Sequence, residues 1–171
     1  MGCTSGATGA SAGGKTSNAK PLSVNETKNF SELETYMKDR YNITVTDDVK
    51  NLNFNAVKEG LQGVEQMMND YPELKDTLKT IKTSKSGVMS CGGETINFNP
   101  FYFAGADADT RLKEMAVQNS DTRWWTPNAS VKSAAIHETA HALVYQMTTK
   151  HINNIYAGFS PDMQKRMTIM A

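Results

Sequence analysis

The stretch from Ala134 to Leu143 constrains this chain more than any other, because it contains the pattern His-Glu-x-x-His. Residues four apart on an α-helix lie one turn above each other on the same face. His137 and His141 can therefore direct two imidazole nitrogens at one metal ion. Glu138 lies about 100° further around the helix axis, which brings its carboxylate beside that ion. The spacing thus predicts a helix that carries two metal ligands and a neighbouring acid.

The residues around the motif favour a helical setting. Apolar Leu143 follows the motif, and Pro and Gly are absent between Ala129 and Thr149, so a helix of about five turns is allowed. Ser130 or Asn128 can cap its N-terminus. A chance occurrence on an amphipathic helix is the alternative, although two of only three histidines in the chain have the ligand spacing. The flanking residues are all uncharged: Ala135, Ile136, Thr139, Ala140 and Ala142.

At this point the chain resembles the zincin metallopeptidases, whose extended signature also asks for uncharged residues around His-Glu-x-x-His and a hydrophobic residue after it. The resemblance implies an α+β, zincin-like fold, with helices packed on a small sheet or hairpin and a central motif helix. It also implies Zn²⁺ as the cofactor, with His137 and His141 as ligands. A catalytic zinc keeps one position open for water and lowers the pKa of that water toward neutrality. Glu138 is then the expected general base for peptide-bond hydrolysis.

A zincin needs a third protein ligand, which this sequence does not identify. A metzincin would have a histidine six residues after His141, where Met147 stands, so that family is excluded. His151 would lie about 15 Å further along a continuous helix, too far to share a metal, and could return only if the helix breaks. Asp162, at the apparent start of another helix, is a second candidate. Glutamate zincins use a Glu on a later helix, so either that residue lies beyond Ala171 here or the metal site is degenerate and lacks a third ligand.

Apolar residues at helical spacing predict further helices. Ser31 is expected to cap the first of them, with Glu34 completing a capping box. The segment 55–70 is the strongest, and the resemblance implies that such a helix backs the sheet and packs on the motif helix. A brief β-type stretch is expected at 43–45. The expected helices are 29–41, 55–70, 73–81 and 107–118.

After these helices the pattern changes to alternation. Segments 87–91 and 94–99 read as two strands joined by a turn at Gly92–Gly93. Ile96 and Phe98 are expected on a buried face of the hairpin, because they alternate with polar residues that are expected on the exposed face: Thr95, Asn97 and Asn99. Zincins offer an edge strand that pairs with an extended substrate, and the resemblance makes this hairpin the candidate for that edge. An ordinary hairpin that closes a small sheet is the alternative.

Four aromatic residues are weaker site candidates. Trp124 and Trp125 precede the motif helix, and they either line a substrate cleft or cap the core. Tyr145 and Tyr156 follow the motif and are candidates to donate a hydrogen bond to the oxyanion that forms during hydrolysis, although no pattern assigns that role.

Charge and composition exclude several classes of function. The 18 basic and 18 acidic residues give a net charge of zero, so no basic field is available for nucleic acid or an anionic membrane. No apolar run has the length of a transmembrane helix, and the first 20 residues lack the hydrophobic segment of a signal peptide. Cys3 and Cys91 are expected to be free thiols. A cytoplasmic or virion-associated location is therefore expected.

The first 20 residues are rich in Gly, Ser, Ala and Thr, which predicts a flexible linker or tail over 1–20. Residues 21–171 are predicted to be a zincin-like metallopeptidase domain, truncated at its C-terminus and part of a longer polypeptide. The layout resembles the His-Glu-x-x-His domains appended to phage minor head or structural proteins and to bacterial toxins. Two functions are expected as alternatives: a zinc-dependent endopeptidase acting on peptide or protein substrates, or a non-catalytic zincin-fold module for interaction or assembly.

Overall fold

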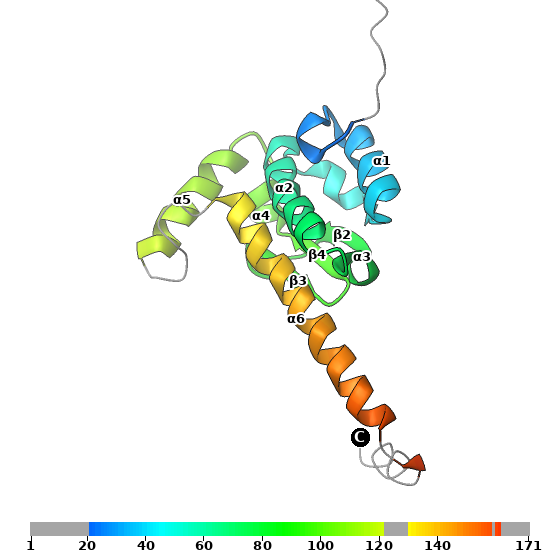
Figure 1. Ribbon diagram of the computed structural model, residues 1–171. Helices are drawn as coiled ribbons and strands as arrows, with labels where there is room; N and C mark the ends of the chain where they lie inside the picture. Colours follow the sequence, from blue (N-terminus) through cyan, green and yellow to red (C-terminus); the bar gives the residue numbers. More distant parts are fainter. Residues whose placement is uncertain (1–20, 122–129, 159, 162–171) are drawn as a thin grey trace, which may run out of the picture.

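The computed structural model describes residues 21–121, 130–158 and 160–161, so the predicted linker at 1–20 lies outside it. The described residues form six α-helices and one four-stranded sheet (Figure 1), which confirms the expected α+β class. In chain order the elements are η1 (Val24–Glu26), α1 (Phe30–Tyr41), β1 (Thr44–Val45), η2 (Asp47–Asn51), α2 (Phe54–Asp70), α3 (Leu74–Thr77), β2 (Thr80–Thr83), β3 (Met89–Gly92), β4 (Thr95–Phe98), α4 (Pro100–Phe103), α5 (Ala108–Asp121) and α6 (Val131–Ala157).

The sheet has the strand order β1-β2-β4-β3. Strands β1, β2 and β4 are parallel, whereas β3 runs antiparallel to β4. Ile81, Ile96 and Phe98 are buried on the face that packs against the helices. Among the described strands β3 pairs with β4 alone, so its other side is an open edge. The hairpin expected from the alternation is confirmed.

The turn of this hairpin lies one residue later than predicted, at Gly93–Glu94. Gly93 has a φ of 58°, a left-handed conformation that glycine adopts without a steric cost. Gly93 takes the first central position of the two-residue turn, where hairpins favour a glycine with positive φ, and Glu94 takes the second.

The prediction of one helix over 73–81 is wrong. Helix α3 ends at Thr77, and the following residues form strand β2. The sequence Thr80-Ile81-Lys82-Thr83 contains three β-branched residues, which fit a strand, and the strand lies between β1 and β4. Pairing on both sides satisfies the backbone hydrogen-bonding groups of this segment. These bonds to two neighbouring strands decide its conformation over the weak helical spacing of its apolar residues.

The predicted cap of the first helix is also wrong. The side chain of Asn29, not Ser31, accepts the hydrogen bond from the backbone N–H of Glu32, at 3.0 Å. The carboxylate of Glu32, not that of Glu34, reaches back to the backbone N–H of Lys28 at 2.9 Å. Asn and Ser cap helices about equally well, so the composition of this segment did not distinguish the two starts.

Helix α2 packs closely against α6 (Figure 1), so that their backbones nearly touch at Gly63. A Cβ atom on Gly63 would lie 2.4 Å from the carbonyl oxygen of Lys132 and 3.0 Å from the Cβ of Ala135. Only a residue without a side chain allows this approach of the two backbones. The packing fixes the first turns of α6, and the motif follows one turn later. Completely buried residues of α2 at this interface and in the sheet core are Val57, Leu61, Val64 and Met68.

Helix α6 is longer than the five turns predicted, and its C-terminal half projects from the body (Figure 1). Gln146 still donates a hydrogen bond to the carbonyl of Glu73 at 3.0 Å. Beyond it, residues 147–155 are exposed apart from Thr149. No helix in the described part of the chain combines the length and hydropathy of a membrane span. The exposed apolar residues of this half are Val144, Tyr145, Met147, Ile152 and Ile155.

Candidate metal centre

The motif residues converge on one point beside α6. The Nε2 atoms of His137 and His141 lie 3.2 Å apart, and the ligand atoms of both histidines and Glu138 lie within 4.8 Å of one another. Two nitrogens bound to a tetrahedral zinc at its usual bond length lie about 3.3 Å apart. The geometry therefore allows a metal-binding site. Without a metal, the same separation permits an N–H···N hydrogen bond between two neutral rings.

The motif helix is buried on one side only. Ala135, Thr139 and Ala142 are buried against the body, whereas both imidazoles are exposed and Glu138 is half-buried. The site is therefore open to solvent and to a ligand that approaches from that side.

Ser130 caps α6. Its Oγ accepts a hydrogen bond from the backbone N–H of Ser133 at 3.1 Å, and the Oγ of Ser133 accepts one from the N–H of Ser130 at 2.8 Å. Ser130 is one of the two caps that the sequence predicted, and the other, Asn128, is outside the described ranges. The reciprocal contact satisfies two backbone donors at the start of the helix and fixes where the motif falls along it.

Glu138 is anchored to the open edge of the sheet. Its Oε2 accepts a hydrogen bond from the backbone N–H of Cys91 in β3, at 3.1 Å. Because this N–H points away from β4, it belongs to the side of β3 that no other described strand occupies. The carboxylate retains Oε1 as a further acceptor. The two residues are 47 positions apart, and no local pattern in the sequence signals the contact.

The thiol of Cys91 lies close to the site without joining it. Burial, reinforced by the negative charge of Glu138, raises the pKa of this thiol to about 11. Without a metal the thiol therefore stays protonated at neutral pH. Within the described residues, no other His, Cys, Asp or Glu joins the cluster of His137, Glu138 and His141.

The structure rules out one of the candidate third ligands. Helix α6 continues without a break through His151, ten residues after His141. At 1.5 Å per residue, the two histidines are about 15 Å apart along the axis, so His151 does not share a metal with the motif. The other candidate in the chain, Asp162, lies in a segment that the structure does not describe.

Of the four aromatic candidates, only Tyr145 can be placed. Its ring lies 3.7 Å from the position of a Cβ on Gly93, so it sits beside the hairpin turn, one helical turn after His141. Its role as an oxyanion donor stays a prediction. Trp124, Trp125 and the side chain of Tyr156 are not among the described positions.

We expect the contact between Glu138 and Cys91 to contribute to stability. Glu138→Gln keeps a carbonyl oxygen that can accept the hydrogen bond, whereas Glu138→Ala leaves the N–H of Cys91 without this acceptor. A hydrogen bond to a neutral acceptor contributes about 0.5–1.5 kcal/mol. Glu138→Ala should therefore be less stable than Glu138→Gln by about 1 kcal/mol in urea denaturation, although alanine is the better helix former. Equal stabilities would show that the contact contributes nothing.

No family model, no curated protein and no solved structure matches this chain. The functional argument therefore rests on the site itself.

Proposed function

We propose that this chain is a zinc-dependent metallopeptidase domain of the zincin type. The observation that carries the proposal is the pair of imidazole nitrogens 3.2 Å apart, with a carboxylate beside them and an open strand edge next to that carboxylate. Two features that the resemblance implies support it. A long helix, α2, packs on the motif helix, and an edge strand, β3, lies beside the motif.

The chemistry divides between the metal and the chain. His137 and His141 would hold a zinc ion, which would supply a Lewis acid to acidify water and polarise a carbonyl group. Glu138 takes a proton from the attacking water and later donates it to the leaving amine. The hydrogen bond from Cys91 holds one oxygen of Glu138, which orients the carboxylate and leaves Oε1 to transfer the proton.

An extended peptide is the substrate class that fits the surroundings of the motif. Met89 and Cys91 are two residues apart in β3, so the backbone N–H and C=O groups of both point to the open edge. A peptide that adds to this edge as a further strand gains backbone hydrogen bonds without regard to its sequence. Because Glu138 already accepts the N–H of Cys91, a peptide would pair with the edge at Met89 and would then pass directly beside the acid.

Metal analysis tests the first half of this proposal. Purified protein should contain one zinc ion per chain, and His137→Ala or His141→Ala should weaken zinc binding at least about tenfold, because each removes one of the few ligands. His151→Ala is the matched control, since it removes an exposed histidine of the same helix and should leave the affinity unchanged. Zinc binding that is indifferent to His137 and His141 contradicts the site.

The second candidate is a non-catalytic zincin-fold module that serves interaction or assembly, as in the phage and toxin proteins that the layout resembles. The projecting half of α6 favours it, because Val144, Met147 and Ile152 are each 57% exposed or more. Exposed apolar groups on one element are typical of protein–protein contacts. A protein that holds zinc but cleaves no peptide would support this candidate. The expected location, cytoplasmic or virion-associated, stays a prediction.

A further inference from the structure

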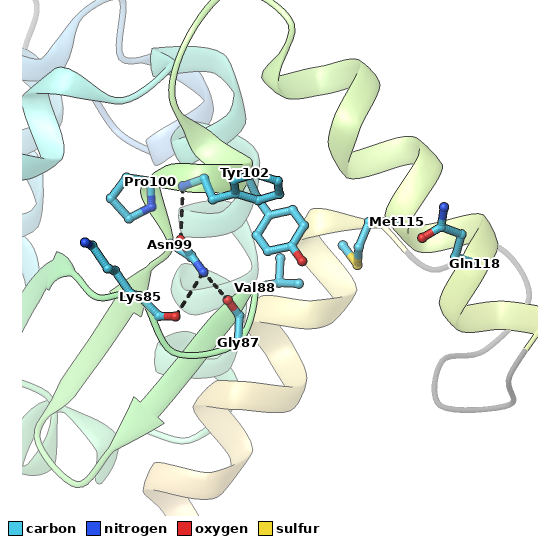
Figure 2. Close-up of a pocket in the computed structure, with 9 residues that line it drawn as sticks. Lys85, Gly87, Val88, Asn99, Pro100, Tyr102, Met115 and Gln118 are labelled. Atoms are coloured by element: carbon cyan, nitrogen blue, oxygen red, sulfur yellow. Dashed lines mark hydrogen bonds between the residues drawn. The ribbon is translucent and has the colours of Figure 1, made fainter.

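A cavity of about 700 Å³ lies at the beginning of β3, outside the metal centre. Figure 2 shows its walls, which come from the segment before β3, from α4 and from α5. Val88, Tyr102, Met115 and the exposed ring of Phe101 form the apolar part of its lining, and the polar part includes Lys85, Asn99 and Gln118. Among the described residues that line the cavity, Lys85 alone is charged.

One wall of the cavity is held in place by Asn99. The sequence placed this residue on the exposed face of its strand, but its side chain is only 7% exposed. The amide nitrogen donates hydrogen bonds to the carbonyl groups of Lys85 and Gly87, and the amide oxygen accepts one from the N–H of Phe101 at 3.0 Å (Figure 2). These three bonds tie the segment before β3 to the start of α4, so the cavity has a fixed wall.

The cavity lies along the same strand as the proposed peptide edge. Val88 immediately precedes β3, and three residues later Cys91 donates its N–H to Glu138. At about 3.4 Å per residue this separation is about 10 Å. Side chains alternate between the faces of a strand, so Val88 faces the side of the sheet opposite to Cys91. A peptide paired with β3 would therefore bring to the cavity a side chain about three residues away from the bond beside Glu138.

We propose that this cavity is a specificity subsite for a large apolar side chain, the size of Leu or Phe, of an extended peptide bound along β3. This inference rests on the proposed peptidase function. The apolar lining is removed from water when such a side chain enters. A Lys or Arg side chain is rejected, because the cavity offers it the charge of Lys85 and no lining carboxylate.

Titration of the full chain, labelled with ¹⁵N, tests the subsite without any need for catalysis. The probes are N-acetyl-phenylalanine amide, N-acetyl-leucine amide and N-acetyl-lysine amide. We expect the first two to shift the amide signals of Val88, Tyr102 and Gln118, and the lysine derivative to bind at least tenfold more weakly. Equal binding of all three probes, or shifts confined to other regions, would overturn the subsite.

Two variants sharpen this test. Val88→Trp should fill the cavity and abolish the shifts caused by the phenylalanine derivative, with thermal unfolding as the check that the variant is folded. Lys85→Glu should reduce the discrimination against the lysine derivative at least fivefold. Lys82→Glu is its matched control, because Lys82 is also exposed but does not line the cavity. If Val88→Trp fails to fold, Lys85→Glu decides the matter: unchanged discrimination overturns the proposal.

Hydrolysis separates the subsite from the proposed function. Blocked decapeptides that differ only in having Phe, Ala or Lys three residues from the cleaved bond should differ at least tenfold in kcat/KM, in the order Phe, Ala, Lys. If no peptide is hydrolysed, the proposed function fails, and the titration alone decides the subsite. If the peptides are hydrolysed equally well, the subsite fails and the peptidase proposal remains.

Discussion

Glu138→Gln is expected to bind zinc as the natural chain does and to hydrolyse peptides about 10²–10⁴ times more slowly. The glutamine amide is close in shape to the carboxylate and its carbonyl oxygen can keep the hydrogen bond from Cys91, so the fold and the two histidines should be undisturbed. It cannot take a proton from water at neutral pH, and the proposed mechanism depends on that step. The measurements are zinc stoichiometry and kcat/KM on an unstructured protein substrate.

Glu94→Gln is the matched control for this experiment. It makes the same chemical change in an exposed residue of the neighbouring hairpin turn, outside the cluster around the metal centre. Its activity should equal that of the natural chain. If Glu138→Gln and Glu94→Gln both cleave at the natural rate, Glu138 is not the general base, and the non-catalytic module becomes the better account of a zinc-binding chain.

Gly63→Ala is expected to destabilise the protein by about 1–3 kcal/mol, the usual range for overpacking a tight core. The added Cβ would meet the backbone oxygen of Lys132 at 2.4 Å, and a backbone atom cannot turn aside as a side chain can. Relief of the contact requires α2 and α6 to move apart, which would also shift Glu138 relative to Cys91. A lower midpoint in urea denaturation and weaker zinc binding should therefore appear together.

Whether Gly63→Ala stabilises or destabilises the protein tells whether α2 and α6 are in close contact. In an exposed helix, replacing Gly by Ala stabilises by about 1 kcal/mol, so the expected destabilisation arises only if the close helix contact exists. Gly92→Ala is the control, since nothing lies within 4 Å of its added Cβ. If Gly63→Ala instead raises the free energy of unfolding by about 1 kcal/mol, as in an exposed helix, α2 and α6 are further apart than described.

Local sequence patterns correctly predicted those helices and strands that are determined by the residues within them. The segment 55–70 carries a continuous apolar face, and the motif helix lacks both Gly and Pro, so both helices follow from short-range periodicity. The hairpin follows from the alternation around Ile96 and Phe98, which are buried as expected. The spacing of His137 and His141 was enough to predict that their nitrogens converge.

Features that depend on distant partners were missed. Thr80–Thr83 becomes a strand because β1 and β4 lie on either side of it, and neither neighbour is visible in the segment itself. The hydrogen bond between Cys91 and Glu138 joins two elements that only the completed sheet brings together. Asn99 was expected at the surface from strand alternation, but the carbonyl groups that bury it belong to a loop earlier in the chain.

The projecting half of α6 places the candidate metal centre at a boundary of local stability. Up to Gln146 the helix is held by the body, and beyond it the backbone hydrogen bonds are supported mainly by the helix alone. Short helical segments without packing open readily in water. Amide protons near Ala135 should therefore exchange with solvent only when the whole domain unfolds, whereas those near Ile152 should exchange when the helix end frays. A cation that linked His137 to His141 would hold one turn just before this boundary, so its binding and the fraying of the helix end would be thermodynamically coupled.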